Sequence, residues 1–202
     1  ALGSSVSSVS VTGNIKFDMT IEPKLHAQAT ILRESWQRNG KELIWLAAST
    51  HPGEDEIILD AFKKIKRRLD HVMLVITPRH PERFTPVYRM AQDTGLGVLR
   101  CSKITTQGFD ADILIGDTMG ELIIYYGASD IAFVGGSLVP IGGHNMIEPA
   151  AWEKPIISGP YIHNFNEVAK LLYDAEALAF CETADELASQ VMQLCEDEEA
   201  GK

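Results

Sequence analysis

The most informative part of this chain reads Phe133-Val134-Gly135-Gly136-Ser137 and resumes, a few residues later, as Gly142-Gly143-His144-Asn145-Met146-Ile147-Glu148-Pro149-Ala150-Ala151. The apolar run 130–134 is typical of a buried parallel strand, and it stops at a Gly-Gly-Ser turn. The second glycine pair opens a segment that predicts a helix starting near His144. The pattern is therefore a strand, a glycine-rich turn and a helix.

The same residues have the chemistry of a nucleotide site. Glycine lets backbone N–H groups approach a ligand because it has no Cβ, and the start of a helix carries partial positive charge that attracts phosphate. We therefore predict that Gly135, Gly136, Ser137 and Gly143 cradle a phosphate. Glu148 lies about one turn into the expected helix, where its carboxylate can accept hydrogen bonds from two ribose hydroxyls. This combination favours nucleotide-sugar binding, and the alternative is a joint in which the glycines serve only packing.

Apolar strand patterns alternate with helical patterns along most of the chain. The expected strands are 43–48, 72–77, 97–100, 113–115, 130–134 and 155–158. The expected helices are 23–39, 54–69, 82–93, 119–127, one from 145, 165–175 and 185–195. Such alternation predicts an α/β fold, a Rossmann-like parallel sheet with helices on both faces. Ligands of these sheets bind beyond the carboxyl ends of the strands, and every motif discussed here follows such an end.

Composition and charge exclude several classes of function. The formal charge of −10 argues against nucleic acid as a partner, because phosphate backbones need a basic surface. No segment reaches the ~18 apolar residues of a membrane-spanning helix, and no signal peptide is recognisable. The three cysteines are odd in number and form no CxxC pair, which favours reduced thiols in a cytoplasm over disulfides or zinc.

Four blocks, in order along the chain, carry a resemblance to a known family. The segment FVGGSLVPIGGHNMIEPAAWEKPIISGPYIHNFNEV resembles the signature region of the bacterial Kdo transferases. The other blocks are GNIKFD at 13–18, STHPGE at 49–54 together with PRHPERF at 78–84, and GDTMGEL at 116–122. Members of this family transfer 3-deoxy-D-manno-octulosonic acid (Kdo) from CMP-Kdo to lipid A precursors in lipopolysaccharide biosynthesis.

The resemblance implies a two-domain GT-B glycosyltransferase, of which this chain is similar only to the C-terminal, donor-binding half. It implies a linker and hinge segment at 1–18 and a domain at 19–202 that binds CMP-Kdo and the product CMP. An N-terminal domain would supply the membrane anchor, the acceptor groove and the general base of an inverting reaction. The present chain is then expected to hold no catalytic residue and to be inactive alone. The whole protein is expected at the cytoplasmic face of the inner membrane.

The loop after the first strand is a candidate site for the donor phosphate or the Kdo carboxylate. Ser49 and Thr50 offer hydroxyl groups, and His51 would lie at the cap of the next helix, with Pro52 at the first helical position. The alternative is ordinary capping, which this loop performs in any case.

Arg79 and His80 leave the second strand at the same edge. The guanidinium group of Arg79 suits a carboxylate or a phosphate, and His80 adds a donor. The alternative for Arg79 is a salt bridge to a neighbouring helix, a structural role that Arg83 fills better because it lies inside the following helix.

Two further segments complete the predicted site. The backbone at Met119 and Gly120 is placed to read the cytosine edge, although the spacing of Thr118 and Glu121 is also that of a helix capping box. The side chains of His144 and Asn145 can donate to phosphate oxygens. No metal is expected, since the chain has neither a DxD motif nor a histidine pair with zinc spacing.

Two other functions stay open from the sequence. One is a transferase or epimerase that uses a UDP-linked sugar on the same scaffold, and the other is a non-catalytic nucleotide-binding module.

Overall fold

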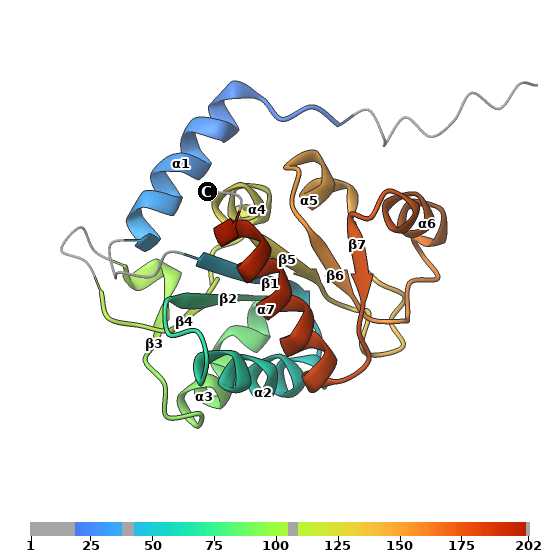
Figure 1. Ribbon diagram of the computed structural model, residues 1–202. Coiled ribbons are helices and arrows are strands. Elements are labelled where there is room, and N and C mark those ends of the chain that lie inside the picture. The colour runs from blue at the N-terminus through green and yellow to red at the C-terminus, as the bar shows by residue number, and fades with distance from the viewer. Residues whose placement is uncertain (1–18, 38–42, 105–108, 201–202) are drawn as a thin grey trace, which may run out of the picture.

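The computed structural model describes residues 19–37, 43–104 and 109–200, with side chains up to residue 196. A parallel sheet of seven strands, in the order β3-β4-β2-β1-β5-β6-β7, forms its centre (Figure 1). Each neighbouring pair of strands runs in the same direction. The strands are β1 Leu43–Thr50, β2 Val72–Pro78, β3 Val98–Arg100, β4 Ile113–Ile115, β5 Ile131–Val134, β6 Ile156–Ser158 and β7 Leu178–Phe180.

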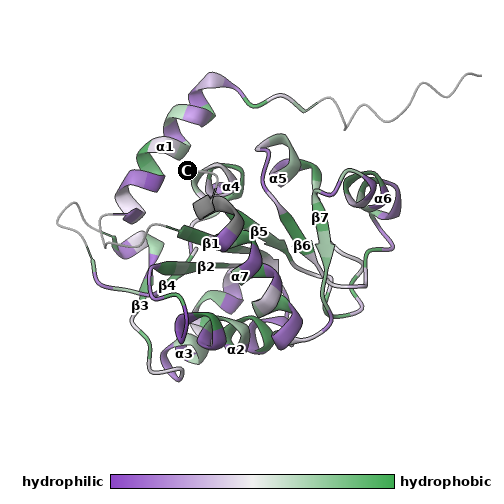
Figure 2. Cartoon of the chain, in the orientation of Figure 1, coloured by the Kyte–Doolittle hydropathy of each residue, from purple (hydrophilic) through white to green (hydrophobic). Residues whose placement is uncertain are grey.

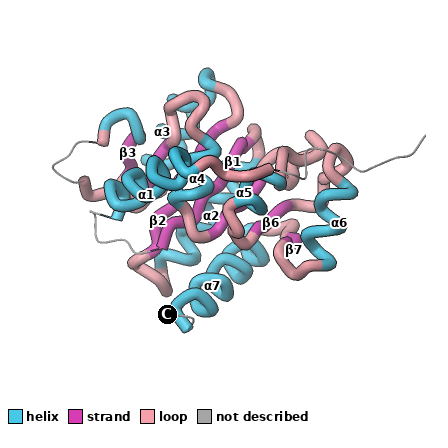
Figure 3. The backbone as a smooth tube through the Cα atoms, turned by 90° about the horizontal axis from the view of Figure 1, so that it is seen from above, coloured by secondary structure: helices cyan, strands magenta, loops and turns pink. Residues whose placement is uncertain are grey.

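Helices cover both faces of this sheet, so the predicted α/β, Rossmann-like fold is confirmed. They are α1 Pro23–Gln37, α2 Glu54–Lys66, α3 Phe84–Gln92, α4 Leu122–Ala128, α5 Ile147–Ala151, α6 Asn166–Asp174 and α7 Ala184–Ala200, with short 3-10 turns at η3 Pro81–Arg83 and η4 Cys101–Lys103. Helices α2 and α7 pack against each other on one face, and α1 packs against α4 on the other. Figure 3 shows α1 and α4 side by side over the strands.

The sheet has two apolar faces because alternate residues of each strand point to opposite helix layers. In β1, whose eight residues are all buried, Trp45 contacts Phe62 of α2, and Ile44 belongs to the opposite cluster, with Trp36 and Tyr125. Burial on both faces explains why the strands read as continuous apolar runs. The hydropathy colouring shows this apolar centre beneath more polar helix surfaces (Figure 2).

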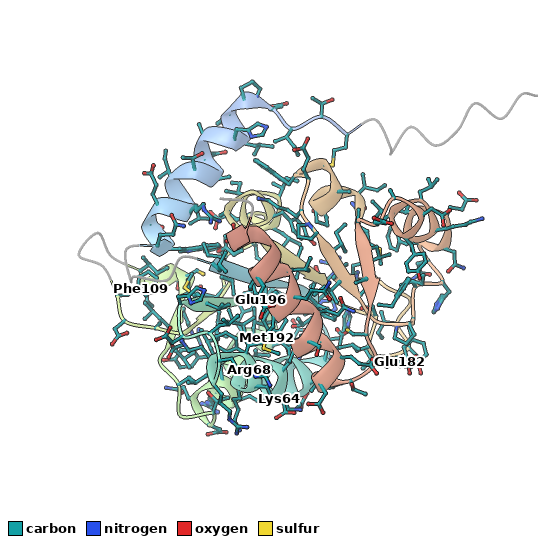
Figure 4. All side chains as sticks on the ribbon, viewed as in Figure 1. Lys64, Arg68, Phe109, Glu182, Met192 and Glu196 are labelled. Carbon is teal, nitrogen blue, oxygen red and sulfur yellow. The ribbon has the colours of Figure 1, made fainter. Side chains whose placement is uncertain are left out.

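The outer surface of the α2–α7 layer carries opposite charges. Figure 4 shows Lys64 of α2 and Arg68, which follows the end of α2, near Met192 and Glu196 of α7. The Lys64 ammonium group lies 2.7 Å from the Asp185 carboxylate at the start of α7 and 3.0 Å from Asp60 on its own helix. The Lys64–Asp185 pair joins the two helices, although exposed pairs of this kind contribute little to stability.

Several predicted elements differ from the observed ones in their bounds. The helix expected from 145 begins at Ile147 and has only five residues, because Gly142 and Gly143, at φ 108° and 79°, extend the preceding loop. The helix expected at 119–127 begins at Leu122, and the expected capping box does not form. Strand β7, at the edge of the sheet and with only Leu178 buried, was not predicted. The linker and hinge assigned to 1–18, including the GNIKFD block, lie outside the described residues.

The strand order reverses between β1 and β5, which lie side by side although α2, β2, β3 and β4 separate them in sequence. The chain leaves β1 towards β2 on one side, and β5 borders β1 on the other. The loops after β1, β2, β4 and β5 therefore meet at one edge of the sheet, as expected for the ligand side of a Rossmann-like fold.

Candidate functional site

A cavity of about 460 Å³ opens at this edge of the sheet. Five of the residues predicted for the site line it, although they come from four separate segments: Ser49, Arg79, Met119, Gly120 and Glu148. The rest of the lining is Thr77, Pro78, Phe84, Gly116, Thr118, Leu122, Ile123 and Tyr125. The cavity thus combines apolar walls with one guanidinium and one carboxylate group, as small-molecule sites usually do.

Ser49 has an unusual backbone conformation where β1 ends. Its φ of 55° is left-handed, and the pairing of β1 with β2 shifts between Ala48 and Thr50. The Ser49 carbonyl consequently approaches Gly135, where an added Cβ would lie 2.6 Å from that oxygen. Gly135 therefore serves close packing of the two loops. Non-glycine residues in this conformation carry strain and concentrate at functional sites.

Glu54 was not predicted for the site, and it occupies the predicted phosphate cradle. Its carboxylate, which is 0% exposed, accepts backbone N–H bonds from Gly136 at 2.8 Å and from Ser137 and Leu138 at 2.9 Å. It also accepts the N–H of His51 at 2.9 Å. The sequence offered only an acidic residue in a first helical turn, which is a common feature of helices.

The glycine-rich turn therefore binds a carboxylate of the chain itself, and this corrects the predicted phosphate cradle. The N–H of Gly135 donates to the carbonyl of Ala48 at 2.8 Å, and the N–H of Gly143 donates to that of Gly136 at 2.8 Å. With the bonds to Glu54, every N–H group assigned to the cradle has a partner in the protein. The glycines shape the site without offering these donors to a ligand.

The hydroxyl groups of two predicted site residues, Ser137 and Thr50, are also engaged inside the protein. The buried Ser137 hydroxyl donates to the Val134 carbonyl at 2.6 Å and accepts the N–H of Gly159 at 2.8 Å. The Thr50 hydroxyl, also buried, donates to Asp55 at 2.6 Å. The role proposed for Thr50 and Ser137 as direct ligand contacts is therefore corrected to a structural one.

Arg83 and Arg79 have different surroundings, because Arg83 is paired inside the protein and Arg79 faces the cavity. Arg83 pairs with the buried carboxylate of Asp55 and donates to the Thr50 carbonyl at 2.6 Å. Burial raises the pKa of Asp55, while the bonds from Thr50 and Arg83 favour its ionised form. Arg79 lies on the cavity, and its guanidinium group forms no hydrogen bond or ion pair with the described part of the chain. It is available for an anionic ligand.

Three histidines gather beside Arg79. The Nε2 atoms of His51 and His144 lie 2.8 Å apart, and their rings are nearly parallel with centroids 5.0 Å apart, so that the two rings meet at their Nε2 edges. The ring of His80 meets His51 edge-on at 5.8 Å. Burial, together with the nearby His51, Arg79 and His80, lowers the pKa of His144 to about 4. Burial is also the main cause that lowers the pKa of His51.

Glu148 faces the cavity with help from Asn145. The Asn145 side chain donates to the Glu148 carboxylate at 3.1 Å, and its oxygen accepts the N–H of Ile147 at 3.0 Å. Asn145 was predicted as a phosphate donor; its amide group orients Glu148 through one N–H, its oxygen binds the first N–H of α5, and the second N–H of the amide stays a candidate donor for a ligand. The carboxylate of Glu148 keeps further acceptor capacity for a ligand.

The loop after β4 forms the opposite wall. Met119 is 64% exposed at the cavity, and Gly120 has a φ of 81°. The Thr118 hydroxyl lies 2.6 Å from the Tyr125 hydroxyl instead of capping the helix. This contact leaves the backbone of Met119 and Gly120 at the cavity surface, where it was predicted to read a base.

In the described ranges, no group of three or more His, Cys, Asp or Glu side chains is arranged to hold a metal ion. Asp117 accepts hydrogen bonds from the backbone and hydroxyl of Ser102 at 2.9 and 2.7 Å. None of the described helices is both long enough and apolar enough to cross a membrane.

Comparisons with known proteins identify close relatives. The chain is 39% identical over 200 residues to the 3-deoxy-D-manno-octulosonic acid transferase of Haemophilus influenzae, covering 98% of this chain and 46% of that protein. The transferase of the same name from Aquifex aeolicus is 36% identical over 149 residues, 74% of this chain and 41% of the relative. The chain therefore spans less than half the length of these relatives. No family model matches it.

A solved structure matches nearly the whole chain. It is the C-terminal CMP-Kdo binding domain of WaaA from Acinetobacter baumannii, with a TM-score of 0.80 and 30% sequence identity. The match covers 89% of this chain and 93% of that domain.

Proposed function

This chain belongs to the Kdo transferase family, and we propose that it is the domain that binds the donor CMP-Kdo. The observation that carries the proposal is the cavity at the carboxyl edge, where the unpaired cation Arg79 and the acceptor Glu148 face the same space. A nucleotide presents a phosphate and a ribose diol in one molecule, and these two side chains have the matching charges and hydrogen-bonding groups.

The remaining cavity residues complement the other parts of a cytidine nucleotide. Glu148 accepts hydrogen bonds from the ribose hydroxyls, and Arg79 binds the phosphate or the sugar carboxylate. The apolar wall of Pro78 and Phe84 gives the base a surface for packing, while the backbone at Met119 and Gly120 supplies the polar contacts. Ser49 lines the cavity beside Arg79, whereas His51, His80 and His144 lie near Arg79 without forming part of the cavity lining.

In the whole protein, these groups stabilise the departing CMP. Charge that develops on the leaving phosphate is balanced by preorganised cations, which is commonly the largest contribution to such catalysis. The acceptor is a lipid A precursor, and a carboxylate outside this chain deprotonates its hydroxyl in an inverting displacement. The reaction belongs to lipopolysaccharide biosynthesis at the cytoplasmic face of the inner membrane, and no metal takes part.

Titration calorimetry of the isolated domain with CMP and with UMP tests the proposal. CMP is expected to bind in the millimolar range or better and more tightly than UMP, because the bases differ at the edge that faces Met119 and Gly120. A folded domain that binds neither nucleotide at millimolar concentration contradicts donor binding. Preference for UMP would favour the transferases and epimerases of UDP-linked sugars.

A further inference from the structure

His51 and His144, which both lie near Arg79, share a hydrogen bond between like atoms. A distance of 2.8 Å between the Nε2 atoms of His51 and His144 requires that one of them carries a hydrogen and the other a lone pair. The ring planes are only 16° apart, so the hydrogen bond can lie close to the plane of both rings. Neither Nδ1 atom forms a hydrogen bond with any residue in the described ranges.

The protonation state of this pair fixes what it offers to a ligand. When both rings are neutral, the ring that donates through Nε2 has a bare Nδ1, and the other ring has a protonated Nδ1. The neutral pair therefore presents one donor and one acceptor, and the acceptor repels an anion. One added proton converts both Nδ1 atoms into donors and gives the pair a positive charge.

The groups around the pair keep it neutral while the site is empty. Arg79 and His80, from the loop after β2, oppose a charge on either ring, and Arg83 opposes one on His51. Glu54 of α2 has the opposite effect and raises the pKa of His51. Partial burial is the largest cause that lowers the pKa of both rings, and the cations add to it. An anion bound here would offset the positive potential of the neighbouring cations and favour protonation of the pair.

We propose that the His51–His144 pair binds the phosphate of the nucleotide as a singly protonated unit, so that binding takes up one proton from solution. The inference rests on the proposed function and adds that donor affinity is linked to pH through these two rings. The proton enters the pair from water when CMP binds and returns to water when CMP leaves, so no other reactant is required.

The pH dependence of CMP affinity is the direct test. A site that needs a proton loses affinity as the pH rises between the pKa of the free pair and that of the complex, up to tenfold per pH unit. We expect the Kd for CMP to rise about tenfold between pH ~6.5 and ~8. The phosphate of CMP gains its second charge near pH ~6, which alone would strengthen binding as the pH rises. Cytidine, which has no phosphate, is expected to show no such trend.

Two variants and one control test whether the pH dependence of CMP affinity comes from His51 and His144. His51→Gln and His144→Gln each replace a ring by an amide that cannot be protonated, and each should flatten the pH profile. His26→Gln is the control, since His26 packs its ring against Trp152 away from the cavity and should leave the profile unchanged. Histidine ¹⁵N chemical shifts of the unaltered domain give a readout that does not depend on variants folding. They should show both Nδ1 atoms protonated in the CMP complex near pH ~7.

The outcomes separate this inference from the proposed function. Failure to bind CMP at any pH overturns the proposed function. CMP binding with a flat pH profile, or with both rings neutral in the complex, leaves donor binding intact and overturns the proton uptake. A pH trend that persists in both glutamine variants assigns the linkage to other groups and also overturns it.

Discussion

The carboxylate of Glu54 accepts the backbone N–H of Gly136 at 2.8 Å, and this bond joins the first turn of α2 to the glycine-rich turn after β5. The same carboxylate holds three further N–H groups, one of them from His51. A buried anion thus fixes the two loops that border the reversal of strand order. The positions of Gly136 and His51 depend on this one side chain.

Replacing Glu54 by Gln is therefore expected to destabilise the domain. An amide has one acceptor oxygen in place of two, and its NH₂ group would face backbone donors, so buried N–H groups lose their partner. The expected cost is roughly 2–3 kcal/mol in the free energy of unfolding. Urea denaturation measures it, with Glu56→Gln, an exposed acid in the same turn, as the matched control. Equal loss in the two variants would contradict the role given to Glu54.

Stability should also depend on pH through His144. Its pKa in the folded domain is about 4, below the ordinary value of 6.5, so the unfolded chain binds a proton more readily. The contribution is fully present above pH ~6.5 and is lost as the pH falls from there towards ~4. We expect the Tm to fall on acidification through this range, and to fall less in His144→Gln. A parallel decline in both proteins would show that other groups dominate.

Much of the fold was predictable because its signals are local. The strands 43–48, 72–77 and 113–115 were recognised from apolar runs, and their ends correctly located the loops that meet at the cavity. The resemblance to the Kdo transferases, read from four short blocks, was likewise correct. These inferences use neighbouring residues and require no knowledge of distant contacts.

The errors concern the partners that polar groups choose. Glu54 lies 82 residues before Gly136, so nothing near the glycines indicated that a carboxylate of the chain fills their turn. The capping box at Thr118 did not form because the hydroxyl of Thr118 contacts that of Tyr125, seven residues along the chain. Asn145 was assigned to a ligand, yet one N–H and the oxygen of its amide group bind the nearby Glu148 and Ile147. In each case the sequence identified a polar residue but did not indicate which group it binds.

The role of Glu148 is tested by the sugar of the ligand. Glu148→Gln removes a charge-assisted acceptor, which typically contributes about 1.5–3 kcal/mol, or a tenfold to hundredfold change in CMP affinity. The preference for CMP over deoxy-CMP should shrink in the same variant, because one ribose hydroxyl is then no longer recognised. Calorimetry with both nucleotides checks this expectation. A variant that prefers the ribonucleotide as strongly as the unaltered domain would exclude Glu148 as the ribose contact.

Arg79 and Arg83 can be compared directly. Both follow strand β2, but Arg79 lies on the cavity and Arg83 is paired with the buried Asp55. Arg79→Ala should weaken CMP binding in the domain by about 1.5–3 kcal/mol of binding free energy, and it should lower turnover in the whole protein. The Tm should change little, because Arg79 is exposed. Arg79→Lys should recover only part of the loss, since a point charge does not reproduce the planar guanidinium fork. Arg83→Ala should instead lower the Tm, because it leaves the buried Asp55 without its cation. CMP titrations and thermal melts of all three variants make the comparison. Unchanged affinity in Arg79→Ala would leave this arginine without a part in donor binding.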